Sequence, residues 1–181
     1  MTLILDGKVA RAHYAARLKG NIVKLSAKPR LAIIQVGEKE ESSAYIKSKI
    51  KFGGEVGVGV LHIKLPETLG QKEIIDKIKE LNTDKKIDAI IVQLPLPEPL
   101  SSTKDNILNS IVVEKDADGL SMGSKRDRER GKGILPATAR GVMELLEFYK
   151  IEVVGKKVAV LGRSILAGAP IAEAIRKERG L

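Results

Sequence analysis

The stretch IDAIIVQLPLP, residues 87–97, joins a buried strand to an abrupt stop. Residues 87–94 form a short apolar run rich in β-branched side chains, which predicts a strand that is buried on both faces and central in its sheet. The prolines that follow break the strand. Gln93 stands at the end of the apolar run, where its amide needs partners from nearby backbone or from a ligand.

The chain around this stretch alternates strands with amphipathic helices. Further strands are predicted at 31–37 and 59–65, and helices at 38–52, 71–81 and 103–112. Gly53 and Gly54 are expected to end the helix that precedes them. Because strands and helices alternate in this order, we expect a parallel α/β sheet.

Residues 119–133, GLSMGSKRDRERGKG, interrupt this alternation with polar and charged side chains, and they predict a loop or linker. The pattern then resumes with three more elements. They are a helix at 138–150 with Thr138 as its N-cap, a strand at 156–162, and a helix that starts at 171.

The composition favours small anionic ligands in a protein of the cytoplasm. The net charge of +9 suits nucleic acids, phosphorylated cofactors or polycarboxylates, but aromatic residues make up only 3 % and no nucleic-acid-binding module is recognisable. There is no cysteine, and His13 and His62 form no metal-binding spacing, so no metal is expected. No apolar run approaches the roughly 20 residues of a membrane span, and no signal peptide is recognisable.

Three further stretches carry groups suited to chemistry. In ESSAYIKSKI, residues 41–50, Ser42, Tyr45 and Lys49 share one stripe of a helix, which is also what an ordinary solvated face looks like. In EKDADGL, residues 114–120, two aspartates beside a glycine could bind a cation, cap a turn or hold a polar ligand. In VAVLGRSILAGAP, residues 158–170, a strand leads through a glycine turn into a helix, a setting in which backbone N–H groups meet phosphate.

Together these stretches resemble one family. The motifs SxxYxxxK, VQLPLP, KDxDG, PxTxxG and GRSxxxGxP follow one another at 42–49, 92–97, 115–119, 136–141 and 162–170. In this order they resemble the bifunctional methylenetetrahydrofolate dehydrogenase/methenyltetrahydrofolate cyclohydrolase family. The resemblance covers nearly the whole chain, from about residue 4 to about residue 175.

The resemblance implies a role for each motif residue. Lys49 would be the catalytic proton-transfer group, Tyr45 would stack on the folate ring system, and Gln93 would hydrogen-bond Lys49. Asp118 would hold the edge of the pterin. A lysine in a partly desolvated cleft can exchange protons near neutral pH, which fits this chemistry. The resemblance also implies substrate contacts from Ser42, Leu94 and Pro95, and cofactor contacts from Thr138, Gly162, Arg163, Ser164 and Gly168.

The resemblance implies two reactions in one-carbon metabolism, which supplies purine biosynthesis. Methylenetetrahydrofolate would pass a hydride to NADP, expected in preference to NAD, and water would then convert the methenyl compound to formyltetrahydrofolate. A homodimer is expected for a full-length member. Two alternatives stay open: a chain that is cyclohydrolase-only or an inactive fragment, and a non-catalytic basic α/β module that binds nucleic acid or another polyanion.

The fold implied is α/β with a cleft between two domains. An N-terminal parallel-sheet α/β domain at 1–135 would bind folate, and 136–181 would begin a Rossmann-like dinucleotide-binding domain. We expect that second domain to be truncated relative to the family. The family pattern PCTPxG reads PATARG here, and little loss is expected because the replaced cysteine is not catalytic.

Overall fold

A parallel three-stranded sheet organises the computed structural model, which describes residues 3–178. Its strands are β1 (Arg30–Val36), β2 (Gly59–Leu65) and β3 (Ala89–Val92), and they lie in the order β2-β1-β3. Both pairings are parallel. The prediction of an α/β fold with a parallel sheet is confirmed.

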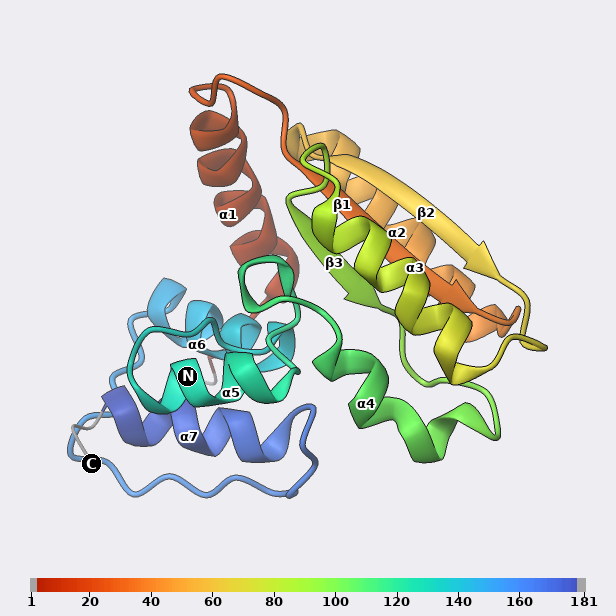
Figure 1. Cartoon of the computed structure of the whole chain (residues 1–181). Helices are drawn as coiled ribbons and strands as arrows, with labels where there is room; N and C mark the ends of the chain where they lie inside the picture. The colour runs from red at the N-terminus through yellow and green to blue at the C-terminus, as the bar shows by residue number, and fades with distance from the viewer. Residues whose placement is uncertain (1–2, 179–181) are drawn as a thin grey trace.

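Helices surround the sheet and continue the chain beyond it (Figure 1). The helices are α1 (Gly7–Ile22), α2 (Glu40–Val56), α3 (Gln71–Thr83), α4 (Lys104–Asn109), α5 (Met122–Glu129), α6 (Ala137–Phe148) and α7 (Gly168–Glu178). Two 3₁₀ turns, Leu100–Thr103 and Val113–Lys115, flank α4. Within residues 3–178, no helix is both long enough and apolar enough to span a bilayer.

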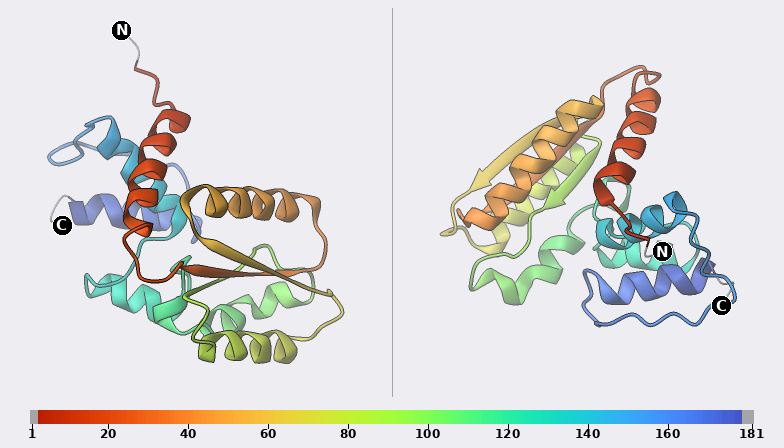
Figure 2. Two further views of the ribbon diagram at one scale, coloured as in Figure 1. Left: turned by 90° about the horizontal axis from the view of Figure 1, so that it is seen from above. Right: turned by 180° about the vertical axis from the view of Figure 1, so that it is seen from behind.

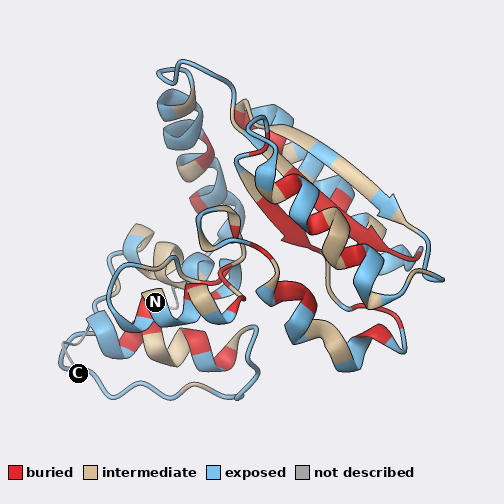
Figure 3. Ribbon diagram, viewed as in Figure 1, coloured by how far each residue is buried: buried red, intermediate tan, exposed pale blue. Residues whose placement is uncertain are grey.

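The two faces of the sheet are covered by different helices, as the left view of Figure 2 shows. Side chains alternate along a strand, so Ile34 and Val92 point into the larger core with α3 and α4. Ile33 and Ile91 point the other way, against Ile46 of α2. Figure 3 shows most of β1 and β3 buried, whereas α1 is exposed over most of its surface.

The prediction that residues 87–94 form the central strand is wrong. β1 is central, and β3 lies at an edge of the sheet. Residues Ile90, Ile91 and Val92 are nevertheless all buried, because helices cover both faces of the strand. An apolar run therefore reports covered faces, and it carries no information about which neighbours pair with its two edges.

The sequence predicted that Gly53 and Gly54 end α2, and this prediction is wrong. The helix continues to Val56 and ends at Gly57, whose φ of 98° is the left-handed conformation that glycine adopts without strain. Gly53 serves packing instead. A Cβ atom there would press against the Val60 side chain on β2, so the absence of a side chain lets the helix approach the sheet.

The predicted loop at 119–133 contains the helix α5. Ser121 caps this helix, because its Oγ accepts a hydrogen bond from the Ser124 N–H at 3.2 Å. The buried Asp116 carboxylate supports the cap by accepting from the Ser121 N–H at 2.9 Å and from the Ser124 hydroxyl at 2.7 Å. The high charge of this segment led to the prediction of a loop. The helix forms because Asp116 and Ser121, which precede it, accept hydrogen bonds from its first residues.

The C-terminal elements also differ from their predictions. α6 begins at Ala137 with Pro136 in the N-cap position, so Thr138 lies inside the helix and does not cap it. Residues 156–162 form no strand, and none of the described strands pairs with them. A strand requires a hydrogen-bonded neighbour, which sequence pattern cannot guarantee. α7 begins at Gly168, three residues before the predicted start.

Replacing Asp116 by alanine should destabilise the protein by about 3 kcal/mol, because three buried donors would lose a charged acceptor. Besides Ser121 and Ser124, the carboxylate accepts from the Gly119 N–H at 3.0 Å. Urea denaturation followed by circular dichroism measures the change. Asp105→Ala, at an exposed carboxylate, is the control and should change stability by less than about 0.5 kcal/mol. Equal midpoints for Asp116→Ala and the parent would contradict this account.

Candidate active site

A pocket of about 420 Å³ lies at the carboxyl end of β3, a size that suits a small organic ligand. It is formed by α2, the end of β3, the segment after Asp116, the start of α6 and the turn before α7. The lining residues are Tyr45, Gln93, Leu94, Asp118, Leu120, Pro136, Ala137, Thr138 and Leu166. Five of these nine were predicted from sequence as site residues.

Lys49 and Gln93 meet beside this pocket. Gln93 directly follows β3, and its side chain lies on the side that faces α2. Its backbone N–H donates to the Ile34 carbonyl at 2.8 Å. The Lys49 ammonium donates to Gln93 Oε1 at 2.9 Å, while Gln93 Nε2 donates to the Leu94 carbonyl at 2.7 Å. Because both ends of the amide are engaged, its oxygen is held toward the lysine.

Asp118 reaches the pocket because its segment is attached to the outer edge of β3. The Ala117 N–H donates to the Ile90 carbonyl at 3.3 Å, which continues the parallel pairing by one residue. Burial raises the pKa of the Asp118 carboxyl above its usual range. The positive charge of Lys49 lowers this pKa in part, and the charge of Asp116 adds to the rise. A carboxyl with these neighbours is suited to a polar, hydrogen-bonding ligand.

The sequence left several roles open for the two aspartates of KDADG, and the structure places their side chains in different settings. Asp116 is buried, and its carboxylate oxygens accept hydrogen bonds from the turn and from the start of α5. Asp118 lines the pocket two residues later. One motif therefore holds an aspartate that supports a turn and, two residues later, an aspartate that lines the pocket.

Tyr45 and Ser42 lie differently although they share one helix. Tyr45 as a residue is 67 % exposed and lines the pocket, so its ring is available to stack on a planar ligand. Ser42 is buried at the start of α2 and is not among the residues that line the pocket, although it was predicted to contact substrate.

A buried polar chain next to α2 was missed from sequence. Gln35 on β1 donates from Nε2 to the Ser43 hydroxyl at 3.1 Å, and its oxygen lies 2.9 Å from His62 Nε2. Burial, followed by the charge of Lys64, lowers the pKa of His62 and favours the neutral ring. An amide oxygen only accepts, so that ring carries its proton on Nε2. Gln35 interrupts an apolar strand as Gln93 does, and that signal could have found it.

Four of the five predicted cofactor residues, Gly162, Arg163, Ser164 and Gly168, lie in the turn before α7 or at the first residue of that helix. A Cβ atom at Gly168 would collide with the Gly162 carbonyl, so glycine is required for the turn to close. The Ser164 hydroxyl accepts from the Leu166 N–H at 3.2 Å. The Arg163 side chain is exposed and forms no hydrogen bond or ion pair within the described part of the chain. Of the five predicted cofactor residues, only Thr138 lines the pocket.

Other pocket residues come from segments whose role the sequence did not reveal. Leu120, Pro136, Ala137 and Leu166 line the pocket without having been predicted, although each lies within or beside a quoted motif. Pro95 is exposed and is not among the lining residues, although it was predicted to contact substrate. Between residues 3 and 178, no group of three or more potential metal ligands gathers.

Comparison with known proteins bears on both halves of the chain. The family profile described as tetrahydrofolate dehydrogenase/cyclohydrolase, catalytic domain, matches residues 5–118. The profile of the NAD(P)-binding domain of the same proteins matches residues 136–180. The bifunctional protein FolD of Mycoplasma mobile is 40 % identical over 177 residues, which cover 97 % of this chain and 61 % of that protein.

Solved structures agree in fold. The bifunctional FolD dehydrogenase/cyclohydrolase of Campylobacter jejuni matches with a TM-score of 0.93 and 36 % identity, over 97 % of this chain and 64 % of that one. The Trypanosoma brucei enzyme, complexed with NADP cofactor and inhibitor, matches with a TM-score of 0.88 and 33 % identity, over 98 % and 62 %. The chain therefore spans less than two thirds of the length of each of these proteins.

Asp118→Asn should stabilise the protein near neutral pH. A carboxyl whose pKa is raised on folding binds its proton more tightly in the folded state. Ionising this carboxyl lowers the free energy of unfolding. The loss is absent below the ordinary pKa of 3.8 and is complete above the pKa of the folded state. The urea midpoint of the variant should therefore exceed that of the parent by a margin that grows as the pH rises above 3.8 and that is complete once the pH exceeds the raised pKa.

Asp105→Asn is the matched control for that measurement, because Asp105 is exposed and should give no such gain. A midpoint for Asp118→Asn that is lower than the parent's at pH 7 would show that the pairing with Lys49 outweighs the burial of the carboxylate.

Proposed function

The chain belongs to the tetrahydrofolate dehydrogenase/cyclohydrolase family, and on this premise we propose that its pocket binds one-carbon tetrahydrofolates with Lys49 as the proton-transfer residue. One observation carries the proposal. Lys49 and Gln93 are joined at 2.9 Å beside a pocket that Tyr45 and Asp118 also line. An ordinary solvated lysine would not be held by an amide whose other end is also engaged.

The hydrolytic step needs proton transfer at two atoms. Water forms a bond from its oxygen to the methenyl carbon and must lose a proton, and the ring nitrogen whose bond to that carbon breaks must be able to leave. Lys49 is half-buried beside the pocket. With Nζ as the neutral amine, it would accept the proton from water, and the resulting ammonium would donate that proton to the departing ring nitrogen. Gln93 positions the amine because its own orientation is fixed by the Leu94 carbonyl.

The remaining pocket residues provide recognition of a flat, polar ring. Tyr45 offers an exposed aromatic face for stacking, and Leu94 provides an apolar contact. Asp118 can hydrogen-bond the edge of a pterin, and its raised pKa favours sharing a proton there. The net charge of +9 suits a substrate that carries carboxylates.

We propose NADP as the cofactor of the dehydrogenase step, in which it would supply the hydride acceptor. The match to an NAD(P)-binding profile and the NADP complex of the Trypanosoma brucei relative support this choice. The residues fit a phosphate-bearing ligand, because the exposed Arg163 and the Ser164 hydroxyl lie next to the start of α7. Thr138 lies where the pocket meets α6.

A second candidate is hydrolysis without hydride transfer. It is favoured by the contrast between the pocket beside Lys49, which is lined by several elements, and residues 156–162, which form no strand before the proposed cofactor turn. Retained hydrolysis without measurable NADP binding would select this candidate over the bifunctional one. A domain boundary at 135/136, a homodimer, and a place in the cytoplasm remain predictions, of which sedimentation tests the second.

Lys49→Met should abolish hydrolysis of methenyltetrahydrofolate, measured as the loss of its near-ultraviolet absorbance. Removing a proton-transfer group costs about 100-fold or more in rate. Lys47→Met is the control, because Lys47 is an exposed lysine of the same helix, and its rate should equal that of the parent. If the parent consumes the compound and Lys49→Met does so equally fast, Lys49 is not the proton-transfer residue.

Arg163→Gln should weaken NADPH binding at least about tenfold, because a charge-assisted hydrogen bond to phosphate would be lost. Titration by NADPH fluorescence gives the dissociation constant. Lys157→Gln removes the same charge from an exposed position before the turn and should bind as the parent does. Equal weakening in both variants would reduce the effect to general charge and would remove Arg163 from the site.

A further inference from the structure

The face of the sheet that α2 covers carries one polar side chain from each strand or its end. His62 on β2, Gln35 on β1 and Gln93 directly after β3 all point toward this helix. Gln93 belongs to the candidate active site, because it accepts a hydrogen bond from Lys49. His62 and Gln35 do not line that pocket, although Gln35 is only 1 % exposed and His62 is half-buried.

His62, Gln35 and Ser43 form a directed chain of hydrogen bonds, which we call the His62 chain. The His62 Nε2–H donates to Gln35 Oε1 at 2.9 Å, and Gln35 Nε2 donates to the Ser43 hydroxyl at 3.1 Å. An amide that accepts on its oxygen presents its nitrogen to its other neighbour, so the imidazole sets which end of Gln35 faces Ser43. An apolar side chain in place of the imidazole would leave this buried amide without the partner that orients it.

The far end of the His62 chain holds the first turn of α2. The N-cap residue Lys39 makes no side-chain hydrogen bond to this helix. In the connection before the helix, Glu38 pairs with Lys64 at 3.3 Å, but both side chains are more than half exposed, and such a pair contributes little. The buried contact from Gln35 to Ser43 is therefore the stronger polar constraint on where α2 begins.

The start of α2 determines where the side chains of the candidate site lie. Tyr45 follows Ser43 by two residues and Lys49 follows it by six, so a shift of the first turn moves both. Lys49 must also keep its contact of 2.9 Å with Gln93, which is attached to a different strand from Gln35. Proton transfer tolerates little displacement, since a misplacement of about 1 Å can cost about 100-fold in rate.

We propose that His62 is a positioning residue for the pocket beside Lys49 and that it acts through Gln35 and Ser43 on the first turn of α2. It sets the orientation of the Gln35 amide and thereby the place of the helix that carries Lys49. The kinetic consequence rests on the proposed function of the pocket. The displacement of the helix can be measured without that function.

His62→Leu should lower kcat for hydrolysis of methenyltetrahydrofolate about tenfold and change KM by less than about twofold. Proton transfer needs Lys49 at a defined place, whereas stacking on the exposed Tyr45 ring tolerates a small slide. His62→Gln is the matched variant, because its side-chain amide can donate to Gln35, and it should restore kcat to within about twofold of the parent. An unchanged kcat in His62→Leu, or an equal fall in His62→Gln, would overturn the proposal.

Ser43→Ala removes the other end of the His62 chain and should lower kcat to a similar extent. Because both changes break the same chain, the double variant should lose little more than either single variant. Ser48→Ala is the control, since Ser48 is an exposed serine of the same helix, and it should retain the kcat of the parent. Additive losses for His62→Leu and Ser43→Ala would show that the two residues act independently, which would overturn the proposal.

The side-chain amide signals of Gln93 in a ¹H–¹⁵N spectrum provide a readout that requires no activity. His62→Leu and Ser43→Ala should both shift these signals, because Lys49 moves relative to Gln93 Oε1, whereas His62→Gln and Ser48→Ala should leave them in place. If the parent does not hydrolyse the compound, the proposed function fails and these shifts alone decide the positioning role. If the parent is active and neither His62→Leu nor Ser43→Ala shifts the signals, the positioning role fails and the proposed function stands.

Discussion

The parallel pairing of β1 with β3 determines which side chains face α2, and the candidate site depends on that choice. Ile34 pairs with Val92, so residues 33, 35, 91 and 93 all point to the α2 face. The inner positions of this face are isoleucines, and the outer positions are the glutamines Gln35 and Gln93. At the carboxyl end of the sheet the apolar core therefore gives way to two side-chain amides, buried at Gln35 and half-buried at Gln93, each of which binds a residue of α2.

These amides explain how α2 is positioned. Gln35 bonds Ser43 in the first turn, and Gln93 bonds Lys49 almost two turns later. Polar contacts of this kind specify one register of the helix on the sheet, because a shift would leave the two amides without these partners. Isoleucine packing alone tolerates small shifts, so the polar contacts are what hold Lys49 at a defined place beside the pocket.

The Asp116 segment supplies the opposite wall under a different constraint. One residue pairs with the free edge of β3, and the buried carboxylate then starts α5. Asp118 is left between these anchors, in a setting that raises its pKa. The hydrogen bonds that Asp116 accepts stabilise the segment and offset the cost of burying the Asp118 carboxyl. Such a division between stabilising and functional residues is common.

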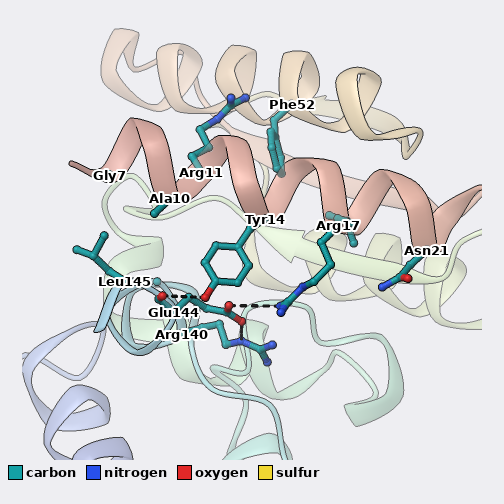
Figure 4. A pocket seen from close by; sticks show the side chains of 12 residues that line it. Gly7, Ala10, Arg11, Tyr14, Arg17, Asn21, Phe52, Arg140, Glu144 and Leu145 are labelled. Carbon is teal, nitrogen blue, oxygen red and sulfur yellow. Dashed lines mark hydrogen bonds and ion pairs between the residues drawn. The ribbon is translucent and has the colours of Figure 1, made fainter. Parts of the chain in front are cut away.

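A second pocket, of about 620 Å³, is built on the same helices α2 and α6 and on α1 (Figure 4). Tyr45 and Thr138 face the candidate active site, whereas Phe52 and Glu144 line this second pocket farther along the same two helices. The sequence by itself determined the α/β class and the parallel sheet, because apolar periodicity is a local property of the chain. The resemblance that its motifs carry implied five of the nine pocket residues. Tertiary structure alone decided that β1 is central and that Gln35 lies on the same face of the sheet as Gln93. It also decided that residues 119–133 contain a helix and that residues 156–162 form no strand. Each of these depends on a partner distant in sequence, and no local pattern records which partner is present.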